Sequence, residues 1–230
     1  MSSDDIEAIF ARELLDAQTD VMREYLVRFN KEVRVFIATL AQAARCWENY
    51  GKQAVEHENE HEELVWSTAY FLNAINAALV STRLFLSGYL VPSGNQVRYS
   101  IESLAFAVLL AFPATGVYSE WQKGRVIEHK AVEWLIRNAD NCGLNKQSVQ
   151  SLDKHAKWYD SYSHPSRSSL ASVWYPNEKG PWMVGGFFAK EHLEQYEKEM
   201  AGRISVAELL VNAICGTQAR LIDLGVLPSA

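Results

Sequence analysis

The chain is short of cysteines and contains no paired cysteine motif. Its 230 residues include three cysteines, Cys46, Cys142 and Cys215, and no two of them have the CxxC spacing of a zinc or redox site. We therefore expect neither a disulfide framework nor a cysteine-rich zinc site. We interpret each cysteine as a small buried apolar side chain in a reducing cytoplasm.

The chain also lacks an excess of basic residues and a long apolar run. The formal net charge is -6 and the pI is about 5.6, so an overall basic footprint for nucleic acid is missing and we expect no DNA partner. The longest apolar run, residues 104–112, is far shorter than the roughly 20 residues that span a bilayer. Residues 1–10 are acidic and do not resemble a secretory signal. These features predict a soluble cytoplasmic protein with no membrane partner.

Helical periodicity is what the first half of the sequence does contain. Apolar residues recur at spacings of three and four through residues 6–29 and again through 33–50, which predicts a long antiparallel or bent helical pair. We interpret Gly51 as the C-cap of this pair. A third helix is predicted from about Glu56 to Tyr89. A fourth, apolar on nearly all sides and therefore central, runs from Ser93 or Asn95 to Phe112 after a turn at residues 90–94.

The second half of the sequence predicts more helices and one exception to them. Helical segments are expected at residues 126–141, 145–164, 190–201 and 205–224, the last with Ser205 and Glu208 as a capping box. The exception is residues 172–188, where β-branched and aromatic residues flank Asn-Glu-Lys-Gly and indicate a short β-hairpin.

These elements predict an all-α fold. We expect a bundle of five to seven helices with the short β-hairpin near residues 172–188. Residues 1–230 form one domain in this interpretation. Residues 1–53 form an N-terminal helical pair, which could serve as an arm or a dimerisation element, and residues 54–230 form the core of the bundle.

The string HENEH, residues 57–61, has the spacing of a zinc-protease motif. On a helix, His57 and His61 would share a face and could bind one Zn²⁺, with Glu58 as general base. However, five glutamates lie between Glu56 and Glu63, and no third ligand follows at a recognisable spacing. We favour a solvated helix start, with surface metal binding by the two histidines and a zinc metalloprotease as alternatives.

Two charged residues interrupt the apolar fourth helix. Arg98 and Glu102 are spaced i, i+4, and charges seldom enter a buried face unless they are paired. One interpretation is a structural ion pair. The other is a guanidinium that Glu102 orients for recognition of a phosphate or carboxylate.

A second polar stretch, residues 155–170, closes a predicted helix. Tyr159 and Tyr162 share a helix face with His155, and His164 lies at the helix end. The stretch offers one candidate for proton transfer, His164, and a set of ligand-binding candidates: Tyr159, Tyr162, Ser163, Ser166 and Arg167. Capping and packing of a buried histidine is the alternative.

These scattered positions resemble a family pattern. Gly88, the Arg98–Glu102 helix and the later Tyr159, Ser163, His164, Pro165 and Ser166 are similar to those of uncharacterised bacterial helical proteins related to the HEPN (higher eukaryotes and prokaryotes nucleotide-binding) superfamily. The resemblance covers roughly residues 60–220.

That resemblance implies a helical bundle, often dimeric, whose active members are metal-independent ribonucleases. Those members have four to six residues between an arginine and the histidine that follows it. This chain departs from the pattern, since Arg125 and His129, its nearest approach, have only three residues between them. Under the resemblance Arg98 would stabilise a phosphate, His164 would be the general acid and base, and Glu102 would orient Arg98.

Two main functional hypotheses follow. The first is a non-catalytic helical bundle that forms a homodimer and binds a partner or ligand without a cofactor. Its support is the lack of a complete catalytic set, together with seven tryptophans and ten tyrosines, which suit interfaces. The second is a HEPN-like ribonuclease or nucleotide-binding protein, with RNA or a nucleotide as its partner. A metalloenzyme built on HENEH is a remote third.

Overall fold

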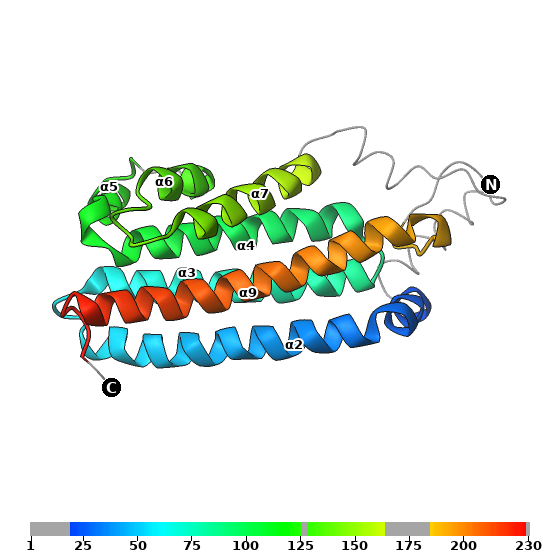
Figure 1. Cartoon of the computed structure of the whole chain (residues 1–230), viewed down its shortest axis with the longest axis horizontal. Helices are drawn as coiled ribbons and strands as arrows, with labels where there is room; N and C mark the ends of the chain where they lie inside the picture. Colours follow the sequence, from blue (N-terminus) through cyan, green and yellow to red (C-terminus); the bar gives the residue numbers. More distant parts are fainter. Residues whose placement is uncertain (1–18, 126–127, 164–184, 229–230) are drawn as a thin grey trace, which may run out of the picture.

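The computed structural model describes residues 19–125, 128–163 and 185–228, and these residues form an all-helical bundle. Helices α2, α3, α4 and α9 run alongside one another, and α5, α6 and α7 pack on the α4 side, away from α2 (Figure 1). The predicted all-α class is confirmed. The helices are α2 (Thr19–Glu56), α3 (Glu62–Leu86), α4 (Leu90–Ala111), α5 (Val117–Gln122), α6 (Ala131–Arg137), α7 (Lys146–Ser163) and α9 (Leu193–Asp223).

Helix α2 is one bent element. Its backbone departs from helical geometry at Phe29, where φ is -113° and ψ is 19°, so the bent form of the predicted pair is the one observed. The predicted C-cap at Gly51 is wrong, because Tyr50 and Ala54 are both fully buried and carry the apolar stripe across Gly51 to the end of α2. Residues 1–18, where the predicted first helix begins, lie outside the described residues.

The boundaries of α3 and α4 differ from the prediction. Residues 57–60 form a turn and α3 begins at Glu62, six residues later than expected. Helix α4 begins at Leu90, so the predicted turn at residues 90–94 is wrong. Pro92 lies in the first turn of α4, where backbone N–H groups have no helical partner to lose.

Small side chains hold α3 and α4 close together. The Ser67 hydroxyl donates to the Ala107 carbonyl (2.8 Å), Ser100 donates to the Ala74 carbonyl (2.7 Å), and Ser81 donates to the Ser93 carbonyl (2.9 Å). Successive contacts are seven residues apart on each helix, which returns them to the same face every two turns. We call this set the serine seam: Ser67, Ala74, Ser81, Ser93, Ser100 and Ala107.

Helix α9 is longer than expected and is bonded to α2. The two predicted closing helices are one, and the capping box at Ser205 is wrong, because Val206, Ala207 and Leu210 keep the buried stripe unbroken through that position. Cys46 of α2 and Cys215 of α9 form a disulfide with a Cα–Cα distance of 5.9 Å. The sequence prediction of unpaired cysteines is therefore wrong for these two. Cys142 is free and buried.

The remaining differences between the predicted and the observed structure lie between the long helices. The predicted helix over residues 126–141 is shorter, with a 3₁₀ turn at Glu128–Lys130 followed by α6. Most of the predicted β-hairpin at residues 172–188 lies outside the described residues, and residues 185–188, which are described, form no strand. The hairpin is therefore not supported.

Helix α3 is the most apolar of the long helices. It is the one described helix whose length and composition would suffice to cross a membrane, with a mean hydropathy of 1.3 over its most apolar window. Half of that window is buried inside the bundle, as it is in the core helices of other helical proteins.

Candidate functional site

The HENEH histidines do not share a helix face. Residues 57–60 form the turn between α2 and α3, and His61 is the residue before α3. The His57 Nδ1 atom lies 2.9 Å from the Gln53 carbonyl oxygen, and the His61 Nδ1 atom lies 3.0 Å from a Glu63 carboxylate oxygen. The premise of the zinc motif, two histidines one turn apart on a helix, is absent here. Over all described residues, no group of three or more His, Cys, Asp or Glu side chains could hold a metal ion.

Arg98 and Glu102 form the ion pair that their spacing predicted. The Arg98 Nε atom donates to Glu102 at 2.9 Å, and the Arg98 Nη1 atom lies 2.9 Å from a carboxylate oxygen of Asp160 on α7. Arg98 and Glu102 are mostly buried, whereas the Asp160 side chain is about half exposed. The guanidinium thus bridges α4 to α7 and is already matched by two carboxylates.

An imidazole lies close to this pair. Burial raises the pKa of Glu102 above its ordinary value of 4.5, and the attraction of Arg98 and of His129 opposes that rise. His129 is exposed on the 3₁₀ turn before α6. We call this group the Arg98 cluster: Arg98, Glu102, His129 and Asp160.

Most of the other predicted catalytic and ligand-binding positions are not placed. His164, Ser166 and Arg167 lie outside the described residues, so their distance from Arg98 is not defined. Ser163 is the last residue of α7, and its side chain is likewise outside the described set. Tyr159 and Tyr162 are placed, and they lie in a second polar group.

This second group is built around a buried glutamate of α9. Glu199 accepts a hydrogen bond from the Tyr162 hydroxyl (2.5 Å) and one from the Trp158 indole (3.2 Å). Its other carboxylate oxygen accepts from the Arg203 guanidinium at 2.6 Å. Glu199 and Arg203 each keep only 1% of their side chain exposed. The set that we call the Glu199 cluster is Ser93, Trp158, Tyr159, Tyr162, Glu199 and Arg203.

Arg203 is held on several sides. Its Nη2 atom donates to the Ser93 hydroxyl at 2.7 Å, and its guanidinium carbon lies 4.4 Å from the centre of the Phe85 ring, within cation–π range. Burial alone would lower the pKa of Arg203, but the neighbouring Tyr159 and Glu199 raise it above its ordinary value. The arginine therefore stays charged inside the bundle, and its charge is neutralised by Glu199.

Two glycines make room for the two tyrosines. A Cβ atom at Gly94 of α4 would lie 2.5 Å from the Tyr162 ring, and one at Gly202 of α9 would lie 2.6 Å from the Tyr159 hydroxyl. Each distance is too short for a real contact, so each tyrosine packs directly on a glycine backbone. This close approach brings α7 against both α4 and α9.

Tyr159 differs from Tyr162 in its hydroxyl. Burial raises the pKa of both phenols, and in Tyr162 the adjacent Glu199 carboxylate raises it further. Whereas Tyr162 donates to Glu199, the buried Tyr159 hydroxyl has no hydrogen-bond partner within the part of the chain that the structure describes. Such a group normally carries an energetic cost.

Sequence reasoning missed Glu199 and Arg203, although a signal was present. Arg203 interrupts an apolar stripe of α9 in the way that Arg98 interrupts α4. That stripe consists of Tyr196, Met200, Ala207, Leu210 and Ile214, all fully buried. The criterion that selected Arg98 would have selected Arg203 too.

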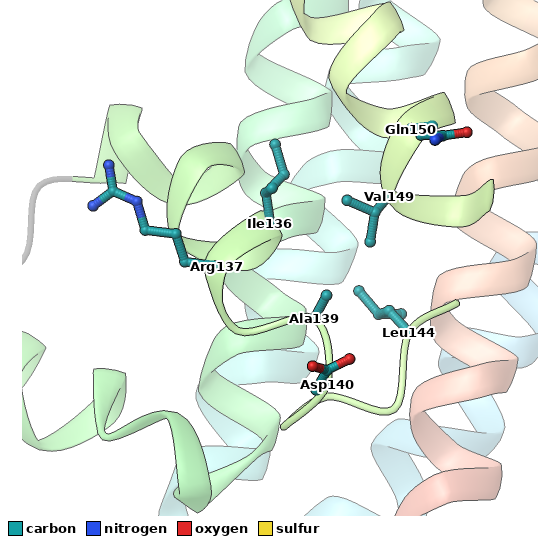
Figure 2. Close-up of a pocket in the computed structure, with 7 residues that line it drawn as sticks. All are labelled: Ile136, Arg137, Ala139, Asp140, Leu144, Val149 and Gln150. Carbon is teal, nitrogen blue, oxygen red and sulfur yellow. The ribbon is translucent and has the colours of Figure 1, made fainter. Parts of the chain in front are cut away.

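A surface hollow lies apart from both clusters. It has a volume of about 270 Å³ and is bordered by the end of α6, the following loop and the start of α7. Figure 2 shows Ile136, Ala139, Leu144 and Val149 around the hollow, whereas the Arg137 side chain extends away from it. The volume is slightly below the roughly 300–1,000 Å³ of ordinary small-molecule sites, and no member of either cluster lines it.

Comparisons with other proteins add no functional assignment to this geometry. No family model, no curated protein and no solved structure matches the chain.

Proposed function

We propose that the protein is a non-catalytic helical bundle that forms a homodimer and binds a partner or ligand. The observation that carries the proposal is that Arg98, the best candidate for a phosphate-binding arginine, is already paired with carboxylates. It is held by Glu102 and Asp160 at 2.9 Å each. An anion would have to displace Glu102 or Asp160, which already pair with the guanidinium. The cluster is therefore better suited to joining helices than to binding a phosphate.

The Glu199 cluster supports the same proposal. Glu199 and Arg203 are 1% exposed and are bonded to each other and to neighbouring side chains. A general acid or base must lie within hydrogen-bonding reach of its substrate. Groups enclosed in this way serve the packing of α4, α7 and α9.

Incubation of the purified protein with structured RNA in EDTA tests the non-catalytic part. We expect no cleavage above a buffer control, and we expect Arg98→Met to lower the melting temperature, because Asp160 and Glu102 then lose their common partner. Cleavage that disappears in Arg98→Met while the variant remains folded would contradict the proposal.

The alternative is a HEPN-like metal-independent ribonuclease or nucleotide-binding protein. A bacterial origin, as in the family that the chain resembles, is part of this alternative. The observation that favours it is the electrostatic influence of His129 on Glu102, which opposes in part the rise that burial causes in the pKa of that carboxyl. An imidazole, an arginine and two carboxylates could support proton transfer and charge stabilisation.

The same RNA assay separates the alternative from the main proposal. Under the alternative, wild-type protein cleaves RNA in EDTA, and His164→Ala or His129→Ala abolishes cleavage without unfolding the protein. Equal cleavage by wild type and both variants would identify a contaminating nuclease.

The geometry of the α2–α3 turn disfavours the remote alternative, a zinc metalloprotease, because His57 and His61 do not share a helix face. Zinc content after purification without a histidine tag tests it. Stoichiometric zinc that is lost in His57→Ala would favour a metal function at the α2–α3 turn.

A further inference from the structure

The outward side of α3 has no charge along most of its length. Residues 64–82 contain no Asp, Glu, Lys or Arg, and several of them are exposed. Trp66 is 41% exposed, Leu79 is 53% exposed and Val80 is 45% exposed. A helix side that faces water normally carries charged and polar residues. An apolar side of this length is a feature of surfaces that another molecule covers.

The exposed residues of α3 lie three, four or seven residues apart, except that Val80 is next to Leu79, and they therefore form one stripe. We call the following members of this stripe the α3 face: Glu62, Trp66, Ala69, Asn76, Leu79 and Arg83. Helix α4 extends it with Tyr99, which is 48% exposed and accepts a hydrogen bond from Asn73 of α3 at 2.8 Å. In Figure 1, α3 lies between α2 and α4 and behind α9, so α9 covers the opposite side of the helix.

The order of residues along the α3 face is symmetric. About the Leu72–Asn73 peptide bond, Glu62 is the mirror position of Arg83, and Trp66 is the mirror position of Leu79. Ala69 and Asn76 form the inner pair. A two-fold axis through the middle of the helix would therefore place unlike charges at both ends and apolar groups between them.

The two charges cannot pair with each other within one chain, where Glu62 accepts a hydrogen bond from the Trp66 indole at 3.2 Å. Glu62 and Arg83 are 21 residues apart on one helix, which separates them by about 31 Å along its axis. In an antiparallel contact with a second copy, each Glu62 would meet the Arg83 of the other chain. A two-fold interface has this property, because residue i contacts residue j and residue j contacts residue i.

We propose that the α3 face is the surface through which two copies of this chain associate, with their α3 helices antiparallel. The inference rests on the homodimer of the proposed function and assigns a surface to it. Two features favour a second copy over a lipid surface. The charges at the two ends are complementary only to an antiparallel copy, and the middle of the face carries the exposed amide of Asn76, which hydrocarbon solvates poorly.

The first test compares one glutamate on the α3 face with one elsewhere. Leu79→Glu introduces charge into the face, and Val27→Glu introduces the same charge on α2 at a position that is 82% exposed. In analytical ultracentrifugation we expect wild type and Val27→Glu to reach twice the 26.0 kDa mass of the chain. We expect Leu79→Glu to raise the dimer dissociation constant at least about tenfold, with an unchanged circular dichroism spectrum.

The second test concerns the antiparallel register. Glu62→Arg and Arg83→Glu should each weaken the dimer about two- to fivefold, because each places like charges opposite one another. The double variant should recover wild-type affinity, since it exchanges the two charges and restores the pairing. Weakening by both single variants without recovery in the double variant would overturn the antiparallel arrangement.

The outcomes distinguish this inference from the proposed function. A dimer that survives Leu79→Glu unchanged overturns the α3 face and leaves the homodimer intact. A monomeric wild type at every concentration overturns the α3 face and the homodimer together. If that monomer binds phosphatidylcholine vesicles and Leu79→Glu abolishes the binding, the face is a lipid surface instead. RNA cleavage bears on the non-catalytic assignment alone.

Discussion

The bundle contains two arginine–glutamate pairs with the same i, i+4 spacing and different surroundings. Arg98 and Glu102 keep 24% and 18% of their side chains exposed, and Arg98 also pairs with Asp160, whose side chain is about half exposed. Glu199 and Arg203 keep 1% each and are enclosed by Ser93, Tyr162 and Phe85. The spacing alone says that two residues can pair. The neighbouring helices decide what the pair contributes.

The difference lies in how each charge is compensated. In the Glu199 cluster, both carboxylate oxygens and both terminal nitrogens of Arg203 have protein partners, which offsets much of the cost of removing two charges from water, while the buried Arg203 Nε atom has no hydrogen-bond partner among the described residues. In the Arg98 cluster, burial outweighs the attraction of Arg98 enough to raise the pKa of Glu102. Loss of the glutamate should therefore lower stability strongly at Glu199 and change it little at Glu102.

The largest effect is expected at Glu199. Glu199→Leu leaves the Arg203 charge buried without its carboxylate, and we expect the free energy of unfolding to fall by about 3–5 kcal/mol. Urea denaturation followed by circular dichroism measures the change.

A matched double variant isolates the cause. Glu199→Leu with Arg203→Met removes both charges, and its loss of stability should be smaller than that of Glu199→Leu alone. A double variant less stable than the single variant would show that the packing of these chains, and not the stranded charge, sets the cost.

The two tyrosines of α7 provide the next comparison. Tyr162→Phe removes a hydrogen bond to the buried Glu199 carboxylate, so the free energy of unfolding should fall by about 1.5–3 kcal/mol. Tyr159→Phe removes a hydroxyl that has no partner among the described residues, and it should leave stability unchanged or raise it.

Thermal unfolding of the two variants side by side gives the answer, since both delete one oxygen atom from a buried tyrosine of the same helix. Equal losses in both variants would contradict the assigned hydrogen bonding. They would point to a partner of Tyr159 in the rest of the chain.

The smallest effect is expected at Glu102. A carboxyl whose pKa is raised by folding stabilises the folded state fully below its ordinary value of 4.5, and this contribution is lost as pH rises through the raised value. Glu102→Gln has no such loss. At pH 7 its free energy of unfolding should lie within about 1 kcal/mol of the wild-type value. Relative to wild type, the variant should become more stable as pH rises from 4 to 7.

Urea denaturation at several pH values checks this trend. Glu133→Gln, on the exposed part of α6, controls for the exchange of a carboxylate for an amide. If the stability of Glu102→Gln relative to wild type fell as pH rises, the inferred direction of the pKa shift would be wrong.

Much of the fold could be predicted from the sequence because helical periodicity depends on residues close together in the chain. The all-α class and the position of α7 follow from it. The junctions could not be predicted in the same way. Gly51 and Ser205 carry local signals for helix ends. The helix nevertheless continues through each position, because buried residues on both sides of it pack against the core.

The candidate site was predictable only in part, for a similar reason. The i, i+4 spacing of Arg98 and Glu102 is local, and their pairing followed from it. Asp160 lies 62 residues from Arg98 and Glu199 lies 37 residues from Tyr162, so these contacts depend on how whole helices pack. The Cys46–Cys215 disulfide, across 169 residues, is the extreme case.

The serine seam also has a consequence for the order of folding. Its innermost contact joins Ser81 to Ser93 across 12 residues, and its outermost joins Ser67 to Ala107 across 40. Such local contacts close with little loss of chain entropy, whereas α2 and α9 must meet from opposite ends of the sequence. We expect the α3–α4 hairpin to form before α9 docks, so Ala74→Gly should slow refolding, whereas Ile214→Val in α9 should mainly speed unfolding. Stopped-flow refolding of the two variants would reveal the order, and a slower refolding of Ile214→Val than of Ala74→Gly would reverse it.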